Sequence, residues 1–125
     1  GYYRETWRAD GGPGLRASGT VIYFLLAEGE RSHWHRVDAT EIWLWHGGAP
    51  LILRLYSERG GLRQVRLGPI EHNTTAEPQV VVPADAWQSA ESLGEYSLVS
   101  CVVSPGFEFS GFELAPDGWE PPRSI

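Results

Sequence analysis

Short apolar or alternating segments recur along this chain about every ten to twelve residues, separated by turns of Gly, Pro and acidic residues. The segment TVIYFLL at 20–26 is an example, and its β-branched and aromatic residues favour a buried strand. Such a chain is expected to fold as an all-β, antiparallel jelly-roll barrel, because two packed sheets avoid long exposed edges. The expected strands are 20–26, 32–37, 41–46, 51–56, 62–67, 79–82, 87–90, 96–103 and 107–114.

With 125 residues, the chain has room for a single domain around one core. We expect a jelly-roll domain over residues 1–115 and a C-terminal tail over 116–125. The tail is rich in proline and charge, and is expected to form a surface strap or to be disordered. The only stretch with helical propensity is ADAWQSAESL at 84–93, and it is short.

The net charge is −6, and the ten basic residues are scattered rather than clustered, so nucleic acid is not an expected partner. All ten are arginine, and the absence of lysine excludes Schiff-base catalysis within this chain. No apolar run approaches the ~20 residues of a spanning helix, so no membrane contact is expected. The single cysteine, Cys101, excludes an internal disulfide and favours a reducing, cytoplasmic location.

Three of the four histidines lie in the segment SHWHRVDATEIWLWHGG, residues 32–48, together with three tryptophans and Glu41. Alternate residues of a strand point to the same face of its sheet. His33 and His35 are therefore expected on one face of their strand, and Glu41 and Trp43 on one face of the next. If these strands are neighbours, His35 and Glu41 converge.

The spacing of Gly29, His35, Val37, Glu41 and Gly48 resembles the first sequence motif of the cupin superfamily, Gly-x5-His-x-His-x3,4-Glu-x6-Gly. Val37 stands where that motif has its second histidine. This departure removes one of the ligands that a metal-binding cupin uses.

The second cupin motif is matched only at Pro83, with Gln88 at the position of its metal-binding histidine and Ser92 at that of its asparagine. Longer phrases, including GYYRETWR, TVIYFLL, PQVVVPADAWQSA and YSLVSCVVSPGFEF, resemble the cupin-5 subfamily of predicted sugar-epimerase-like cupins from Gly1 to about Leu114. The resemblance implies a conical jelly roll with one pocket per barrel, and a homodimer.

A divalent metal in a cupin generally takes three histidines and a carboxylate. His35 and Glu41 remain in register here, while His33 and Gln88 are the residues that could complete a weak site. No cofactor is favoured on this basis, and a divalent metal is the alternative.

An acid–base pair needs fewer groups, because imidazole titrates near neutral pH and a neighbouring carboxylate can orient it. We therefore expect a pocket enzyme that moves a proton beside the carbonyl of a keto-sugar or a natural-product intermediate, as an epimerase, isomerase or lyase does. In this hypothesis His35 is the base, Glu41 orients the imidazole, and Tyr23 or Gln88 holds the enolate oxygen. Trp43 and Trp87 exclude water.

Other polar residues are candidates for binding the small-molecule ligand. Arg4 and Thr6 are expected at the rim of the barrel, where arginine suits a carboxylate or phosphate group. Gln79 and Gln88 stand in apolar contexts and are candidates for the pocket lining. Three alternatives remain open: a His35–Glu41 pair that only holds two strands together, a non-catalytic binding cupin, and a metal-dependent oxygenase or isomerase.

Overall fold

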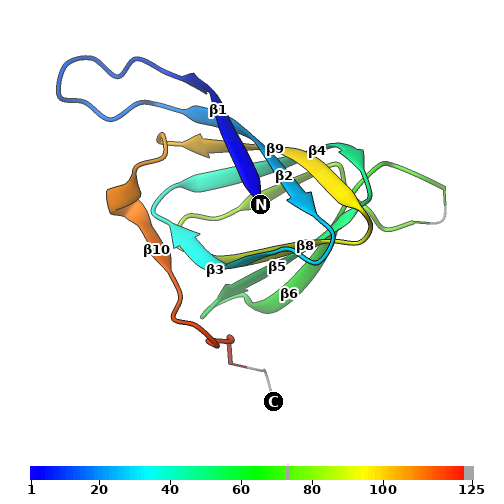
Figure 1. The fold of residues 1–125 in the computed structure, drawn as a ribbon. Helices are drawn as coiled ribbons and strands as arrows, with labels where there is room; N and C mark the ends of the chain where they lie inside the picture. Colours follow the sequence, from blue (N-terminus) through cyan, green and yellow to red (C-terminus); the bar gives the residue numbers. More distant parts are fainter. Residues whose placement is uncertain (73, 123–125) are drawn as a thin grey trace.

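Ten strands in two five-stranded antiparallel sheets form the protein in the computed structural model, which describes residues 1–72 and 74–122 (Figure 1). The first sheet contains, in spatial order, β1 (Tyr2–Arg8), β2 (Thr20–Ala27), β9 (Tyr96–Ser104), β4 (Thr40–Gly48) and β7 (Gln79–Val82). The second contains β10 (Phe112–Leu114), β3 (Arg31–Val37), β8 (Trp87–Ser92), β5 (Leu51–Ser57) and β6 (Gly61–Leu67). The expected all-β jelly roll is confirmed.

Alternating burial along each strand builds the core between the sheets. In β5, Leu51, Leu53 and Leu55 are buried, whereas the intervening residues are only half-buried. These leucines pack with Leu26, Trp43, Leu67, Val80 and Val99 in one cluster between the two sheets. The region between the edge strands β1 and β10 is left for a cavity.

Two elements differ from the sequence expectations. The first strand, β1, was not expected. The expected strand over 107–114 is a 3-10 turn, Phe109–Gly111, followed by the short β10, because the Gly111 amide donates back to the Glu108 carbonyl at 3.0 Å. The strand expected over 87–90 is present as β8, within the segment that has helical propensity, because β3 and β5 pair with it on both sides and such tertiary pairing overrides local propensity.

The described part of the tail, residues 116–122, lies as a strap on the second sheet. Trp119 stacks on Trp87 with ring centroids 4.8 Å apart and meets Trp34 edge-to-face at 5.9 Å. The indole N–H of Trp34 donates to Glu120 at 3.2 Å. The expected surface strap therefore exists over these residues, and the expectation for residues 123–125 lies outside the described part of the chain. Among residues 1–72 and 74–122, no helix is long and apolar enough to cross a membrane.

Candidate functional site

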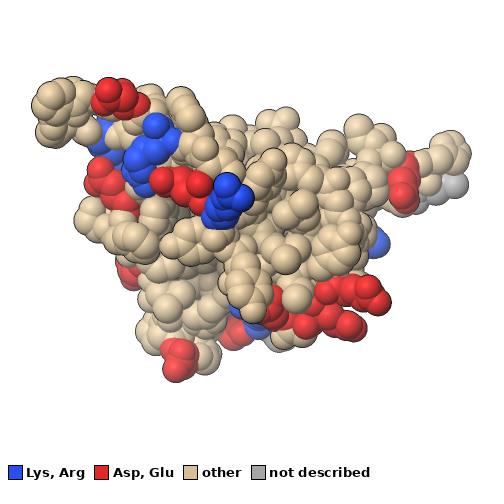
Figure 2. Space-filling view, turned by 45° about the horizontal axis from the view of Figure 1, so that its top comes forward, with Lys and Arg blue, Asp and Glu red and all other residues tan. Residues whose placement is uncertain are grey.

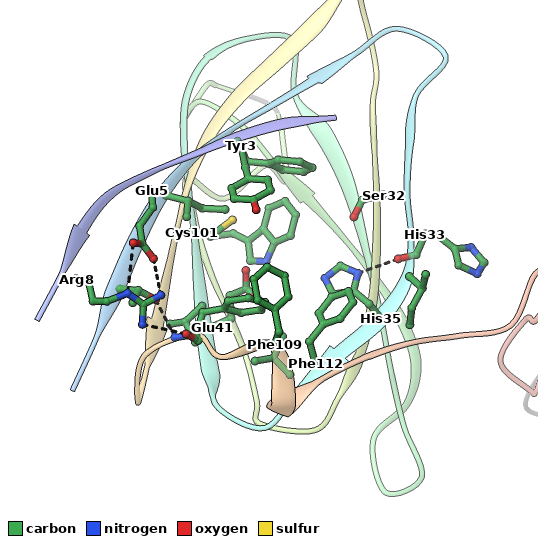
Figure 3. Close-up of a pocket in the computed structure, with 18 residues that line it drawn as sticks. Tyr3, Glu5, Arg8, Ser32, His33, His35, Glu41, Cys101, Phe109 and Phe112 are labelled. Carbon is green, nitrogen blue, oxygen red and sulfur yellow. Dashed lines mark hydrogen bonds and ion pairs between the residues drawn. The ribbon is translucent and has the colours of Figure 1, made fainter. Parts of the chain in front are cut away.

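A cavity of about 530 Å3 lies between the two sheets and opens between β1 and the segment 107–114 (Figure 3). Its size falls in the range of about 300–1,000 Å3 that is typical of small-molecule sites. Much of its wall is apolar and aromatic, with Ile22, Phe24, Val37, Trp43, Val103 and Phe107 among the lining residues. His35 and Glu41 line this cavity from strands that belong to different sheets.

His35 enters the cavity because a β-bulge interrupts β3. The register with β8 shifts between Ser32 and His35, so that these two side chains point to the cavity, while the His33 ring points away from it (Figure 3). The Nδ1–H of His35 donates to the His33 carbonyl oxygen at 2.8 Å. Since a carbonyl can only accept, Nδ1 carries the proton, and Nε2 of the neutral ring keeps a free lone pair.

Glu41 is held by a buried chain of hydrogen bonds. The indole N–H of Trp43 donates to Oε1 of Gln88 at 2.9 Å, which fixes the orientation of the amide. The Gln88 Nε2 then donates to Oε1 of Glu41 at 2.9 Å. Glu41 is 6% exposed and Gln88 is 1% exposed, so this chain lies away from bulk water. The carboxyl group therefore has a single well-defined position.

Burial raises the pKa of Glu41, because an apolar environment disfavours the charged carboxylate. The charge of His35 and hydrogen bonds from Gln88 and Cys101 act in the opposite direction, and burial outweighs them. Cys101 is also buried, and burial together with the neighbouring Glu41 raises its pKa well above the usual value for a thiol. Cys101 is thus a neutral hydrogen-bond donor to Glu41 rather than a nucleophile.

Glu41 was expected to orient the imidazole of His35, but each of the two groups has a different hydrogen-bond partner. The His33 carbonyl fixes the ring, and Glu41 accepts its bond from Gln88. When its ring is protonated, His35 lowers the pKa of Glu41 through its positive charge. The two groups therefore line one cavity and take their hydrogen bonds from different partners.

An ion pair lies at the mouth of the cavity. Arg8 donates to both carboxylate oxygens of Glu5, at 2.7 and 3.3 Å, and to the carbonyl of Phe107 at 3.1 Å (Figure 3). These bonds tie β1 to the segment that precedes β10. Figure 2 looks onto the side of the molecule that carries β1, and basic side chains there adjoin acidic ones.

The residues at the metal-binding positions of a cupin do not form a metal site in this chain. Val37 has no donor atom, and the His33 Nε2 lies 3.1 Å from the Ala115 carbonyl, to which it donates. The amide oxygen of Gln88 already accepts from Trp43. In the part of the chain that the structure describes, no group of three or more His, Cys, Asp or Glu side chains is placed to hold a metal ion. His33 and Gln88 therefore do not complete a ligand set with His35 and Glu41.

Three residues expected at the pocket lie on β1 or on the neighbouring β2 and are not among the residues that line the cavity. On β1, Tyr3 and Glu5 line the cavity, so Arg4 points to the other face of the strand, and Thr6 donates from Oγ1 to the Val21 carbonyl at 3.2 Å. Tyr23, opposite Arg4 on β2, is 48% exposed. On β1, the rim is thus formed by the face that carries Tyr3 and Glu5.

Two further candidates are also outside the cavity. Gln79 is exposed on the edge strand β7. Trp87 lies under the C-terminal strap, where the Arg36 guanidinium stands 4.6 Å above its ring. Trp43 lines the cavity as expected, whereas Gln88 does not line it and lies behind Glu41, to which its amide donates.

Several residues that line the cavity were not predicted from the sequence, above all Tyr3, Glu5, Arg8, Ser32 and Phe112. Figure 3 shows the Tyr3 and Ser32 hydroxyl groups directed into the cavity. The alternation of β1 would have grouped Tyr3 with Glu5, had that strand been recognised. The position of Ser32 depends on the bulge in β3, which no sequence signal announced.

Comparison with known proteins gives matches over nearly the whole chain. The model of the family Cupin_5, described as Cupin superfamily (DUF985), matches residues 1–115. Protein SO0799 from Shewanella oneidensis is 38% identical with a TM-score of 0.85, covering 92% of this chain and 73% of its own. A hypothetical protein from Leishmania major is 32% identical with a TM-score of 0.78, covering 90% and 76%.

More distant solved structures share the fold. A dTDP sugar isomerase from Desulfovibrio desulfuricans is 15% identical with a TM-score of 0.68, covering 93% of this chain and 85% of its own. No match is found among curated proteins.

Proposed function

The chain belongs to the Cupin_5 family of the cupin superfamily, and on that premise we propose that it is a small-molecule enzyme that moves a proton beside a carbonyl group. The observation that carries this proposal is the pair of His35 and Glu41, which line one largely apolar cavity from different sheets. The reaction class is isomerisation, epimerisation or a lyase reaction that begins with the same proton abstraction.

His35 is the general base in this proposal. Its Nδ1–H is committed to the His33 carbonyl, so the lone pair of Nε2 is the group that faces the ligand. The ring lies against Phe112 with centroids 5.5 Å apart, which restricts its rotation. A base held in one orientation by its own strand is ready to accept a proton without rearrangement.

Glu41 is the general acid. Burial raises its pKa, which shifts the carboxyl toward its protonated form, and a protonated carboxyl can donate to the oxygen of a bound carbonyl. Gln88 holds Oε1 by a hydrogen bond, so the other oxygen is the donor to the ligand. Cys101 stabilises the carboxylate that remains after the proton has left.

The proton transfers balance within the site. Nε2 of His35 takes a proton from the carbon next to the carbonyl, and the electron pair of that C–H bond forms the carbon–carbon double bond of an enol. Glu41 gives its proton to the carbonyl oxygen. Return of the enol proton to Glu41, with donation from the imidazolium to the other face of the same carbon, gives the epimer and restores both groups. Where the substrate carries a hydroxyl on that carbon, donation to the former carbonyl carbon and loss of the proton of that hydroxyl to Glu41 give the isomer and likewise restore both groups.

The fold of a dTDP sugar isomerase supports the general idea that such a barrel can host an isomerisation. At 15% identity it supports nothing about the substrate of this chain. Metal-dependent chemistry and simple ligand capture are the competing functions.

Deuterium exchange tests the proposal. Keto-sugars, 2-oxo acids and hydrophobic ketones are incubated with the protein in D2O, and loss of the C–H signal beside the carbonyl is followed by proton NMR. We expect at least one compound to exchange faster with the wild type, and His35→Gln or Glu41→Gln to reduce this rate by about 100-fold or more, as removal of a general acid or base typically does. His46→Gln, an exposed histidine, is the matched control and keeps the full rate.

Binding measurements separate the competing functions. A compound that raises the melting temperature of the protein without exchange in any sample indicates a binding protein. Exchange that persists in His35→Gln removes His35 from the mechanism. A stoichiometric metal ion in untagged protein, lost in His35→Gln, overturns the proposal in favour of a metal-dependent enzyme.

A further inference from the structure

We infer that the ligand of this cavity is a compact, uncharged and mainly hydrophobic carbonyl compound, and neither a free sugar nor a phosphorylated or carboxylated metabolite. The inference rests on the proposed function only for the presence of the carbonyl. Everything else in it comes from the cavity wall.

The charges that line the cavity disfavour an anionic ligand. Among the eighteen residues that line the cavity, all of them described, Arg8 is the one with a permanently cationic side chain. Its Nε and one terminal nitrogen bind the Glu5 carboxylate, and the other terminal nitrogen binds the Phe107 carbonyl. A phosphate or carboxylate group on a ligand would meet Glu5 beside Arg8, so the cation is already neutralised. The mouth therefore offers no net attraction for an anion.

The hydrogen-bonding groups of the cavity disfavour a sugar. The Thr20 hydroxyl accepts from the Phe107 amide at 3.0 Å, and the Cys101 thiol bonds to Glu41, so both are engaged within the protein. Beyond the base and the acid, the side-chain hydroxyls directed into the cavity are those of Tyr3 and Ser32. A sugar carries several hydroxyl groups that lose water on entry, and most would find no partner here. Sugars are consequently disfavoured.

The wall of the cavity is largely apolar and aromatic. Nine of the eighteen lining residues are Phe, Trp, Ile, Val or Leu. Phe109 and Phe112 come from the segment at the mouth, and Phe109 is 76% exposed. Exposed aromatic side chains at the entrance of a mainly apolar cavity favour the entry of a hydrocarbon group, because burying apolar area is favourable on both sides of the contact.

A matched set of probes tests this inference. The uncharged ketone 4-phenylbutan-2-one and the acid 2-oxo-4-phenylbutanoate have the same skeleton, with a carboxylate in place of a methyl group in the second. Xylulose is the polar keto compound. By titration calorimetry we expect the ketone to bind the wild type at least tenfold more tightly than either of the others.

Two variants show that the wall sets this order. Glu5→Gln releases Arg8 from its counter-charge, so the affinity for 2-oxo-4-phenylbutanoate should rise at least fivefold while that for the ketone stays unchanged. Phe109→Ser, at an exposed position where folding is not at risk, should weaken binding of the ketone at least threefold. Neither residue belongs to the proposed acid–base pair.

The inference is overturned if xylulose or the 2-oxo acid binds the wild type as tightly as the ketone, or if the ketone does not bind up to its solubility. Its failure is distinguishable from that of the proposed function. The expected order of binding without deuterium exchange contradicts the acid–base proposal alone. Exchange restricted to xylulose supports that proposal and contradicts the hydrophobic ligand.

Discussion

Replacement of Gln88 by leucine is the perturbation that most sharply probes the buried chain behind the cavity. The amide accepts from Trp43 and donates to Glu41, each at 2.9 Å, and it is 1% exposed, so water cannot replace it. Leucine has a similar volume and leaves no large cavity. It does leave an indole N–H and a carboxyl oxygen without their partners.

The expected loss follows from these two groups. Each buried polar group that loses its partner costs about 1–3 kcal/mol, and the additional apolar burial of leucine returns about 1 kcal/mol. The free energy of unfolding of Gln88→Leu should therefore fall by about 1–5 kcal/mol, with a central value of about 3 kcal/mol. This is a large share of the about 5–15 kcal/mol that a typical domain has.

Urea unfolding followed by tryptophan fluorescence measures this loss. With a slope of about 1–3 kcal/mol per molar urea, the midpoint should fall by about 1–3 M. Gln79→Leu is the matched control, because Gln79 is exposed on β7 and the same substitution there should change stability by less than about 0.5 kcal/mol. A loss below about 1 kcal/mol in Gln88→Leu, or an equal loss in both variants, would refute the reasoning.

Three further outcomes follow. The pKa of Glu41 is raised in the folded protein, so its contribution to the free energy of unfolding is complete below the pKa of an unfolded glutamate. This contribution is lost as pH rises through the folded pKa. The free energy of unfolding of Glu41→Gln should therefore vary less with pH across this window than that of the wild type. Gly48→Ala should lower the stability measured by thermal unfolding more than Gly29→Ala does. Both glycines have positive φ, which costs an alanine about 1–2 kcal/mol, but only at Gly48 would the new Cβ also meet Tyr96. Equal losses of stability in the two variants would contradict this. Cys101 should react with a thiol reagent only when the protein unfolds, and rapid labelling of the native state would contradict its burial.

The homodimer and the cytoplasmic location expected from the sequence remain predictions. Exposed aromatic residues on the edge strand β1, namely Tyr2, Tyr3 and Trp7, are compatible with burial against another surface. Light scattering of the purified protein measures the assembly directly.

Alternation and the family spacing together predicted that His35 and Glu41 face one cavity. The parity of β4 placed Glu41 and Trp43 on one face, and the family spacing selected His35. The same reasoning failed at His33, because the bulge in β3 adds a residue that no period-2 pattern reveals. His33, a candidate metal ligand in the sequence, instead donates to the carbonyl of Ala115, directly before the C-terminal strap.

The strand β1 shows another limit of the sequence. All seven of its residues are exposed, and its aromatic and charged side chains occur on both faces, so the segment YYRETWR has no contrast between a buried and a solvated side. Its pairing with β2 defines it as a strand. Without that pairing, Arg4 and Thr6 were assigned to the rim in place of Tyr3, Glu5 and Arg8.

The protonation of His35 provides the most direct test of the central claim, which is that a fixed imidazole offers a bare Nε2 to the cavity. Nitrogen-15 NMR of the protein labelled at histidine distinguishes the two neutral tautomers of each ring. At a pH where the His35 ring is neutral, we expect its proton to lie on Nδ1 in the free protein. A proton found on Nε2 in the free protein would contradict the assignment of His35 as the base.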